Sequence, residues 1–127
     1  MGFLSFFKKK PKYEVLEEFY TKVVGVTYDN DDGGSRQELL DRSSEGDCIS
    51  LQWVENEHDK NAVAVVNVDV KGHLGFLPKD TARSVVRGMK EGLEYYCEIS
   101  EITGGTKGKP TLGANLLVYK TKVTHYS

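Results

Sequence analysis

The order of apolar and polar residues along the chain predicts a fold built mainly from short strands. Residues 47–55 alternate, with Ile49, Leu51 and Trp53 on one face, and a period of two is typical of a half-buried strand. We therefore expect Trp53 in the core. Other segments are rich in the β-branched and aromatic residues that favour strands. The expected strands cover residues 19–28, 47–55, 61–69, 73–77, 93–102 and 111–121.

Two short helices are expected between these strands. Ser35 and Glu38 have capping-box spacing, in which each side chain can accept a hydrogen bond from the other residue's unpaired backbone N–H. Residues 78–91 repeat apolar side chains at the i, i+3, i+4, i+7 spacing of one buried helical stripe. Mainly β structure with two short helices (α+β) and about six strands favours a partly open barrel.

Length and composition indicate one folded domain behind a short tail. The chain has 127 residues, of which 39% are hydrophobic and 28% charged, an ordinary globular composition. Residues 1–12 (MGFLSFFKKKPK) are expected to form a flexible basic and aromatic tail, and residues 13–127 the domain. No apolar stretch approaches the roughly 20 residues that span a bilayer, so we expect no transmembrane segment and a cytoplasmic location. Cys48 and Cys97 are expected to be reduced core thiols.

The charge distribution limits the kind of nucleic-acid binding that the domain could perform. The net charge is −2, but the four lysines of the tail leave 13 basic and 19 acidic residues in the remainder. Affinity for phosphate backbones in general needs many Lys and Arg contacts. Any nucleic-acid binding by this acidic body is therefore expected to be local, at a strand end or a short stretch.

The residue types that support catalysis are not brought together by the sequence. The three histidines (His58, His73 and His125) have no metal-ligand spacing, either with one another or with the cysteines. The DNDDGG run lacks the carboxylates that a calcium loop needs at its fifth and twelfth positions, which favours a plain turn. We therefore expect no metal, no cofactor and no enzymatic activity.

Three segments in order resemble the HIRAN domain. They are residues 22–28 (KVVGVTY) with Ser35-Arg36-Gln37, residues 56–65 (NEHDKNAVAV) and residues 72–79 (GHLGFLPK). The resemblance covers about residues 19–120 and is carried mainly by N-x-x-D-x-N-A-V and G-x-L-G-x-L-P. It implies a modified OB-like barrel. It also implies a non-catalytic DNA-binding function that prefers single strands or DNA ends, in some members the 3′ end, in DNA repair or processing.

The resemblance also implies which residues would contact DNA. Tyr28 and Phe76 would stack on bases, Asp59 would accept a hydrogen bond from a 3′-hydroxyl, and Lys79 would meet a phosphate. The remaining candidates are Arg36, Asn56, His58 and Asn61. The eukaryotic members that bind DNA ends carry other residues at four places, namely arginine at Thr27, an aromatic residue at Asp29, tyrosine at His58 and histidine at Phe76.

Two other functions remain open on the sequence. The acidic body favours a protein-interaction or regulatory module of phage or mobile-element origin. A metal-dependent nuclease or hydrolase would require several carboxylates to converge on one ion. The candidates for that role are Asp29, Asp31, Asp32 and Asp59.

Overall fold

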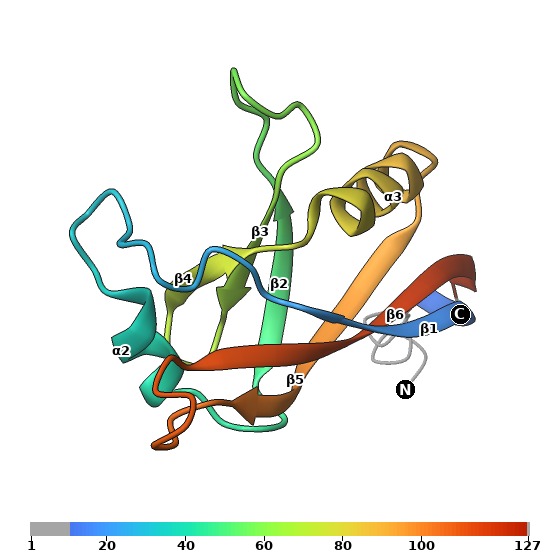
Figure 1. The fold of residues 1–127 in the computed structure, drawn as a ribbon. Coiled ribbons are helices and arrows are strands. Elements are labelled where there is room, and N and C mark those ends of the chain that lie inside the picture. Colours follow the sequence, from blue (N-terminus) through green and yellow to red (C-terminus); the bar gives the residue numbers. More distant parts are fainter. Residues whose placement is uncertain (1–10, 127) are drawn as a thin grey trace, which may run out of the picture.

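Six antiparallel strands form one sheet, in the order β1-β6-β5-β2-β3-β4 (Figure 1). The structure is a computed structural model and describes residues 11–126. The strands are β1 (Pro11–Lys22), β2 (Cys48–Trp53), β3 (Val63–Asn67), β4 (Gly72–Phe76), β5 (Glu94–Thr103) and β6 (Gly113–Tyr126), and the helices are α2 (Arg36–Asp41) and α3 (Lys79–Lys90). The mainly β architecture with two short helices is confirmed.

The two edges of the sheet, β1 and β4, approach each other at one place. Beyond the end of β1, the backbones of Val24 and Phe76 exchange two hydrogen bonds, of 2.8 and 2.9 Å. This single bridge joins the edges without continuing as a ladder, so the barrel is partly open, as expected. Gly75 makes the approach possible, because a Cβ atom there would meet the carbonyl oxygen of Val24, and its φ of 152° is unfavourable for other residues.

The core lies between the sheet and the two helices. Ala82, Val85 and Val86 of α3 are buried and Met89 is partly buried, which confirms the predicted stripe. At the start of α2, the Ser35 hydroxyl accepts a hydrogen bond from the Glu38 N–H at 3.2 Å, as the capping box predicts. Leu40 follows and is fully buried against the same core.

The prediction for the first strand was wrong at both ends. β1 begins at Pro11 rather than residue 19, and its pairing with β6 runs to the end of both strands. The hydrophobic pattern does not predict the first part of this strand. Its apolar side chains are exposed and contribute nothing to the core, namely Tyr13, Val15 and Leu16. The strand ends before residue 25, because Gly25 adopts a φ of 74° and begins a turn.

Two residues expected in the core lie at the surface instead. Trp53 is 38% exposed, because it is the last residue of β2, next to an exposed loop. Cys48 is exposed, since it begins β2, whereas Cys97 is buried, and both thiols are free. Of the predicted tail, Pro11 and Lys12 belong to β1, and residues 1–10 lie outside the described residues.

Within residues 11–126, neither helix is both long and apolar enough to cross a membrane.

Replacing Gly75 by alanine tests the importance of the bridge between the two edges. The added methyl group would meet the Val24 carbonyl, so we expect the free energy of unfolding to fall by about 2 to 4 kcal/mol. Urea denaturation measures the change. Gly108→Ala is the matched control, because a Cβ there meets nothing within 4 Å. Equal stability of the two variants would contradict this account.

Candidate functional site

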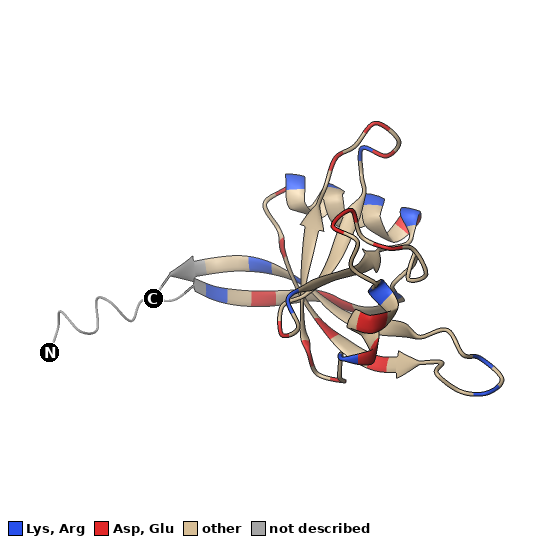
Figure 2. Ribbon diagram, turned by 90° about the vertical axis from the view of Figure 1, so that its left-hand side faces the viewer, with Lys and Arg blue, Asp and Glu red and all other residues tan. Residues whose placement is uncertain are grey.

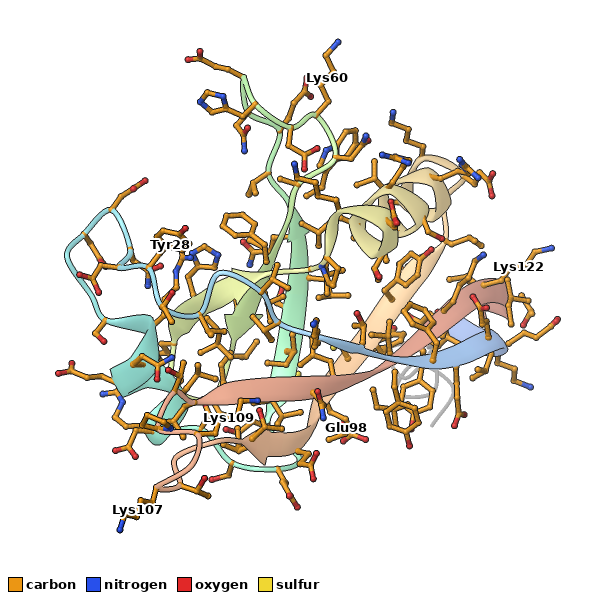
Figure 3. All side chains as sticks on the ribbon, in the orientation of Figure 1. Tyr28, Lys60, Glu98, Lys107, Lys109 and Lys122 are labelled. Carbon is orange, nitrogen blue, oxygen red and sulfur yellow. The ribbon has the colours of Figure 1, made fainter. Side chains whose placement is uncertain are left out.

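An exposed tyrosine is presented on the turn that follows β1. The left-handed conformation of Gly25 reverses the chain, and the Tyr28 N–H donates to the Gly25 carbonyl at 3.3 Å. The Tyr28 side chain is 70% exposed (Figure 3). A large aromatic ring held in solvent by a fixed backbone turn offers a flat surface for a second ring.

A buried arginine holds this turn in place through hydrogen bonds. Arg36, the first residue of α2, is only 8% exposed. Its Nη1 donates to the Gly25 carbonyl at 2.7 Å and its Nε to the Asn30 Oδ1 at 2.8 Å. The guanidinium carbon also lies 5.5 Å from the centre of the Phe76 ring, within the range of a cation–π interaction. Arg36 therefore couples the Tyr28 turn to the ring of Phe76.

His73 completes the group through a second contact with the ring of Phe76. The two rings meet edge to face, with centres 4.9 Å apart, and His73 Nε2 lies 2.7 Å from the Gly75 carbonyl. This contact requires a proton on Nε2, because a carbonyl oxygen only accepts. The Asn30 side chain donates to the His73 carbonyl at 3.0 Å. Burial, and secondly the charge of Arg36, lower the pKa of His73.

The other candidate residues lie together in the loop between β2 and β3. The Asn56 Oδ1 accepts hydrogen bonds from the backbone N–H groups of His58 at 2.9 Å and Asp59 at 2.8 Å. The Asp59 Oδ1 in turn accepts from the Asn61 N–H at 2.8 Å. Such side-chain bonds to nearby backbone are typical of turn-forming residues. They give the loop a fixed shape, and the imidazole of His58 is left exposed.

Phe76 connects the tyrosine turn with this loop. Its backbone bonds to Val24 on one side, and its Cα is paired with Ala64 of β3 on the other. The pairing continues through the Leu77 N–H, which donates to the Val63 carbonyl at 3.0 Å. The chain then enters α3 at Lys79, which is exposed. Phe76 therefore lies between the turn that carries Tyr28 and the strand β3 that follows the loop. Lys79 comes three residues after Phe76.

Three residues of this region were not identified as site residues from the sequence. Trp53 is anchored at the base of the loop, where its Nε1 donates to the Lys60 carbonyl at 2.7 Å. His73 and Asn30 support Phe76 and Arg36 from segments 43 residues apart. The exposure of Trp53 could have been anticipated from its position next to the polar loop. The contact between Asn30 and His73 has no local signal in the sequence.

The described residues do not support a metal centre. Among residues 11–126, no group of three or more His, Cys, Asp or Glu side chains is arranged to hold a metal ion. The carboxylates of Asp31 and Asp32 instead line a hollow of about 740 Å³ beside α2, which does not include Tyr28 or Phe76. Residues 30–34 form a turn in which the Asp32 Oδ1 accepts from the Gly34 N–H at 2.8 Å.

Substituting Arg36 tests its part in holding the turn. Arg36→Met removes the shorter of the two hydrogen bonds to the Gly25 carbonyl and leaves the Asn30 side-chain oxygen without its arginine donor. We therefore expect a loss of about 2 to 4 kcal/mol in unfolding free energy. Chemical denaturation measures it. Arg42→Met, at the other end of α2 and exposed, should change stability by less than about 0.5 kcal/mol. A loss as small in Arg36→Met would show that the network is not needed for folding.

His73 gives the fold a pH dependence of known sign. Because its pKa is lowered in the folded state, the unfolded chain binds the proton at higher pH. Stability is therefore complete above the ordinary histidine pKa of about 6.5 and falls as the pH drops below it. We expect the melting temperature to decrease less between pH 7.5 and 5.5 in His73→Gln than in the unsubstituted protein. Parallel pH profiles for the two proteins would contradict this expectation.

Comparison with known proteins gives one family and two related structures. The model of the family described as HIRAN domain matches residues 16–111. A crystal structure of the HIRAN domain of human HLTF is similar at a TM-score of 0.65 and 18% identity, covering 88% of this chain and 81% of that one. A crystal structure of a protein from Lactobacillus plantarum has the same TM-score and identity, covering 89% of this chain and 99% of that one. Among curated protein sequences, none matches this chain.

At this identity the two structures support the fold alone, whereas the family model covers well over half of the chain. The region matched by the family model includes all three segments that resemble the HIRAN domain in sequence. The chain therefore belongs to the HIRAN domain family, whose domain is a DNA-binding module.

Proposed function

We propose that this domain binds single-stranded DNA or a DNA end, including the 3′ end, without catalysing a reaction. The observation that carries the proposal is the Tyr28 ring, 70% exposed on a turn that Arg36 fixes. The half-buried Phe76 ring contacts the same arginine. Stacking on aromatic rings suits unpaired bases, since every base presents a flat face. In a duplex, those faces are already covered by neighbouring base pairs.

The other candidate residues have separate parts in this proposal. Asp59 uses one carboxylate oxygen within the loop, and the carboxylate can accept a further hydrogen bond from a terminal hydroxyl. Asn56, His58 and Asn61 set the shape and polarity of the same loop. Lys79 is exposed at the start of α3 and meets a phosphate. Arg36 is a positioning residue, because it is buried and its Nε and Nη1 donate to protein acceptors of the Tyr28 turn.

The biological setting proposed for this binding is DNA repair or processing, in which strand ends arise. Within the domain, the residues of the site supply stacking surfaces and hydrogen-bond acceptors. An arrangement of this kind recognises a strand without cutting it.

Fluorescence anisotropy with three labelled DNAs tests the proposal. The DNAs are a single strand with a free 3′-hydroxyl, the same strand with a 3′-phosphate, and a blunt duplex. We expect the free 3′-hydroxyl strand to bind most tightly and Tyr28→Ala to weaken it by about 10- to 100-fold, the value of one stacked base. Tyr20→Ala is the matched control, because Tyr20 is also 70% exposed but lies on β1.

Asp59→Asn separates the hydroxyl contact from the shape of the loop. Asparagine keeps the oxygen that accepts from the Asn61 N–H but removes the charge. This variant should fold normally and lose its preference for the free hydroxyl over the 3′-phosphate. Equal binding of all three DNAs by the unsubstituted protein would refute end recognition. Binding of none of them would refute the proposed function.

A protein-interaction function is the second candidate, and one surface favours it. Tyr13 and Tyr96 are exposed and meet edge to face at 5.3 Å, and the Tyr96 hydroxyl lies 3.4 Å from the Glu94 carboxylate. Exposed tyrosines beside carboxylates are typical of surfaces that bind basic proteins. A DNA affinity that does not fall with rising salt would argue against phosphate contacts and favour this function.

A further inference from the structure

One flank of helix α3 concentrates positive charge on a chain whose body is otherwise acidic. Lys79, Arg83, Arg87 and Lys90 are exposed, and their spacing places them within an arc of about 80° at 3.6 residues per turn. Figure 2 shows Lys and Arg positions along this helix, away from the acidic residues of α2. Within α3, the only carboxylate is that of Asp80, 3.8 Å from the Arg83 guanidinium in an exposed pair. Such pairs are weak, so both groups remain free to exchange partners.

The Lys90 end of this flank lies next to Trp53, at the base of the β2–β3 loop. The Lys90 ammonium lies 5.2 Å from the centre of the Trp53 ring. Trp53 is itself fixed to the loop by the hydrogen bond from its Nε1 to the Lys60 carbonyl. The indole is nevertheless 38% exposed. An anchored, partly exposed ring next to a row of cations is the combination that single-stranded nucleic acids require.

The flank is also continuous with the proposed end-binding site. Lys79 begins the helix two residues after Leu77, whose N–H donates to Val63 at 3.0 Å. From Lys79 to Lys90 the helix rises about 16 Å, close to the length of five phosphates at the 3.4 Å spacing of one stacked strand. A strand whose terminal bases stack at Tyr28 and Phe76 can therefore continue along this flank.

We propose that Arg83, Arg87 and Lys90 bind the phosphates of a single DNA strand beyond its terminal nucleotides, with Trp53 stacking on one of its bases. The proposal rests on the proposed function for the path of the strand, and it adds a second contact region of different chemistry. Glu55 and Glu57 are exposed in the neighbouring loop, and their negative charges disfavour a path across that loop. The binding is therefore directional, from the end-binding site along α3.

The test measures affinity for oligodeoxythymidines of three, six and nine nucleotides with free 3′-hydroxyls. The unsubstituted protein should bind the nine-mer more tightly than the three-mer. In R83Q/R87Q the nine-mer should lose about tenfold in affinity, equivalent to about 1.4 kcal/mol. Its salt slope should fall by about 1.4, at 0.7 for each single-strand phosphate contact. Binding of the three-mer should be unchanged.

Two controls accompany this measurement. K107Q/K109Q removes the same charge from two exposed lysines in the β5–β6 loop, labelled in Figure 3, and should not alter the dependence on length. Trp53 is the single tryptophan of the chain, so its fluorescence reports stacking directly. The nine-mer should quench this fluorescence and the three-mer should leave it unchanged.

The outcomes separate this inference from the proposed function. If R83Q/R87Q keeps the full gain in affinity with length, the α3 contact is refuted, while three-mer binding that depends on Tyr28 still supports the end site. If the nine-mer binds through α3 but Tyr28→Ala changes nothing, the end site is refuted and the flank stands. If no oligonucleotide binds, both proposals fail.

Discussion

The site depends on the backbone bridge between Val24 and Phe76. This contact joins the two edges of a sheet that is otherwise open, and it fixes the turn that carries Tyr28 against the strand that carries Phe76. Without it, only the Arg36 side chain would link the Tyr28 turn to Phe76. The bridge in turn requires Gly75, since no side chain fits against the Val24 carbonyl. One glycine thus determines both the closure of the barrel and the geometry of the site.

The charges and polar groups beneath the site are satisfied by neutral partners. Arg36 is buried without a carboxylate, and its donors meet a backbone carbonyl and an amide oxygen. The loop between β2 and β3 is held by its own side chains in the same way, through Asn56 and Asp59. All of these bonds join groups of the domain itself, so the shape of the surface is set by its own side chains. A surface shaped in this way would lose less entropy on binding a partner.

The sequence predicted the features that local spacing determines. The Ser35 cap and the apolar stripe of α3 depend on residues three or four apart. The stripe is present, and of the two bonds of the capping box the one from the Glu38 N–H to the Ser35 hydroxyl is present. The prediction that Trp53 lies in the core was wrong. Alternation shows which face of a strand points to the core, but it does not show at which residue the core ends. The burial of Arg36 could not be foreseen, because it depends on the approach of Gly25 and Phe76, segments far apart in the chain. The family motifs predict the candidate residues, whereas the hydrogen bonds that hold these residues in place are seen only in the structure.

The pairing of β1 with β6 has a consequence for how the domain fits into larger proteins. Pro11 is paired with Tyr126, so the first and last described residues lie side by side at one end of a long two-stranded ribbon (Figure 1). The two ends of the domain are thus about as close together as the two ends of a hairpin loop. A surface loop of another protein could accept the whole module as an insertion with little strain on either fold. The same geometry would let it be fused at either terminus.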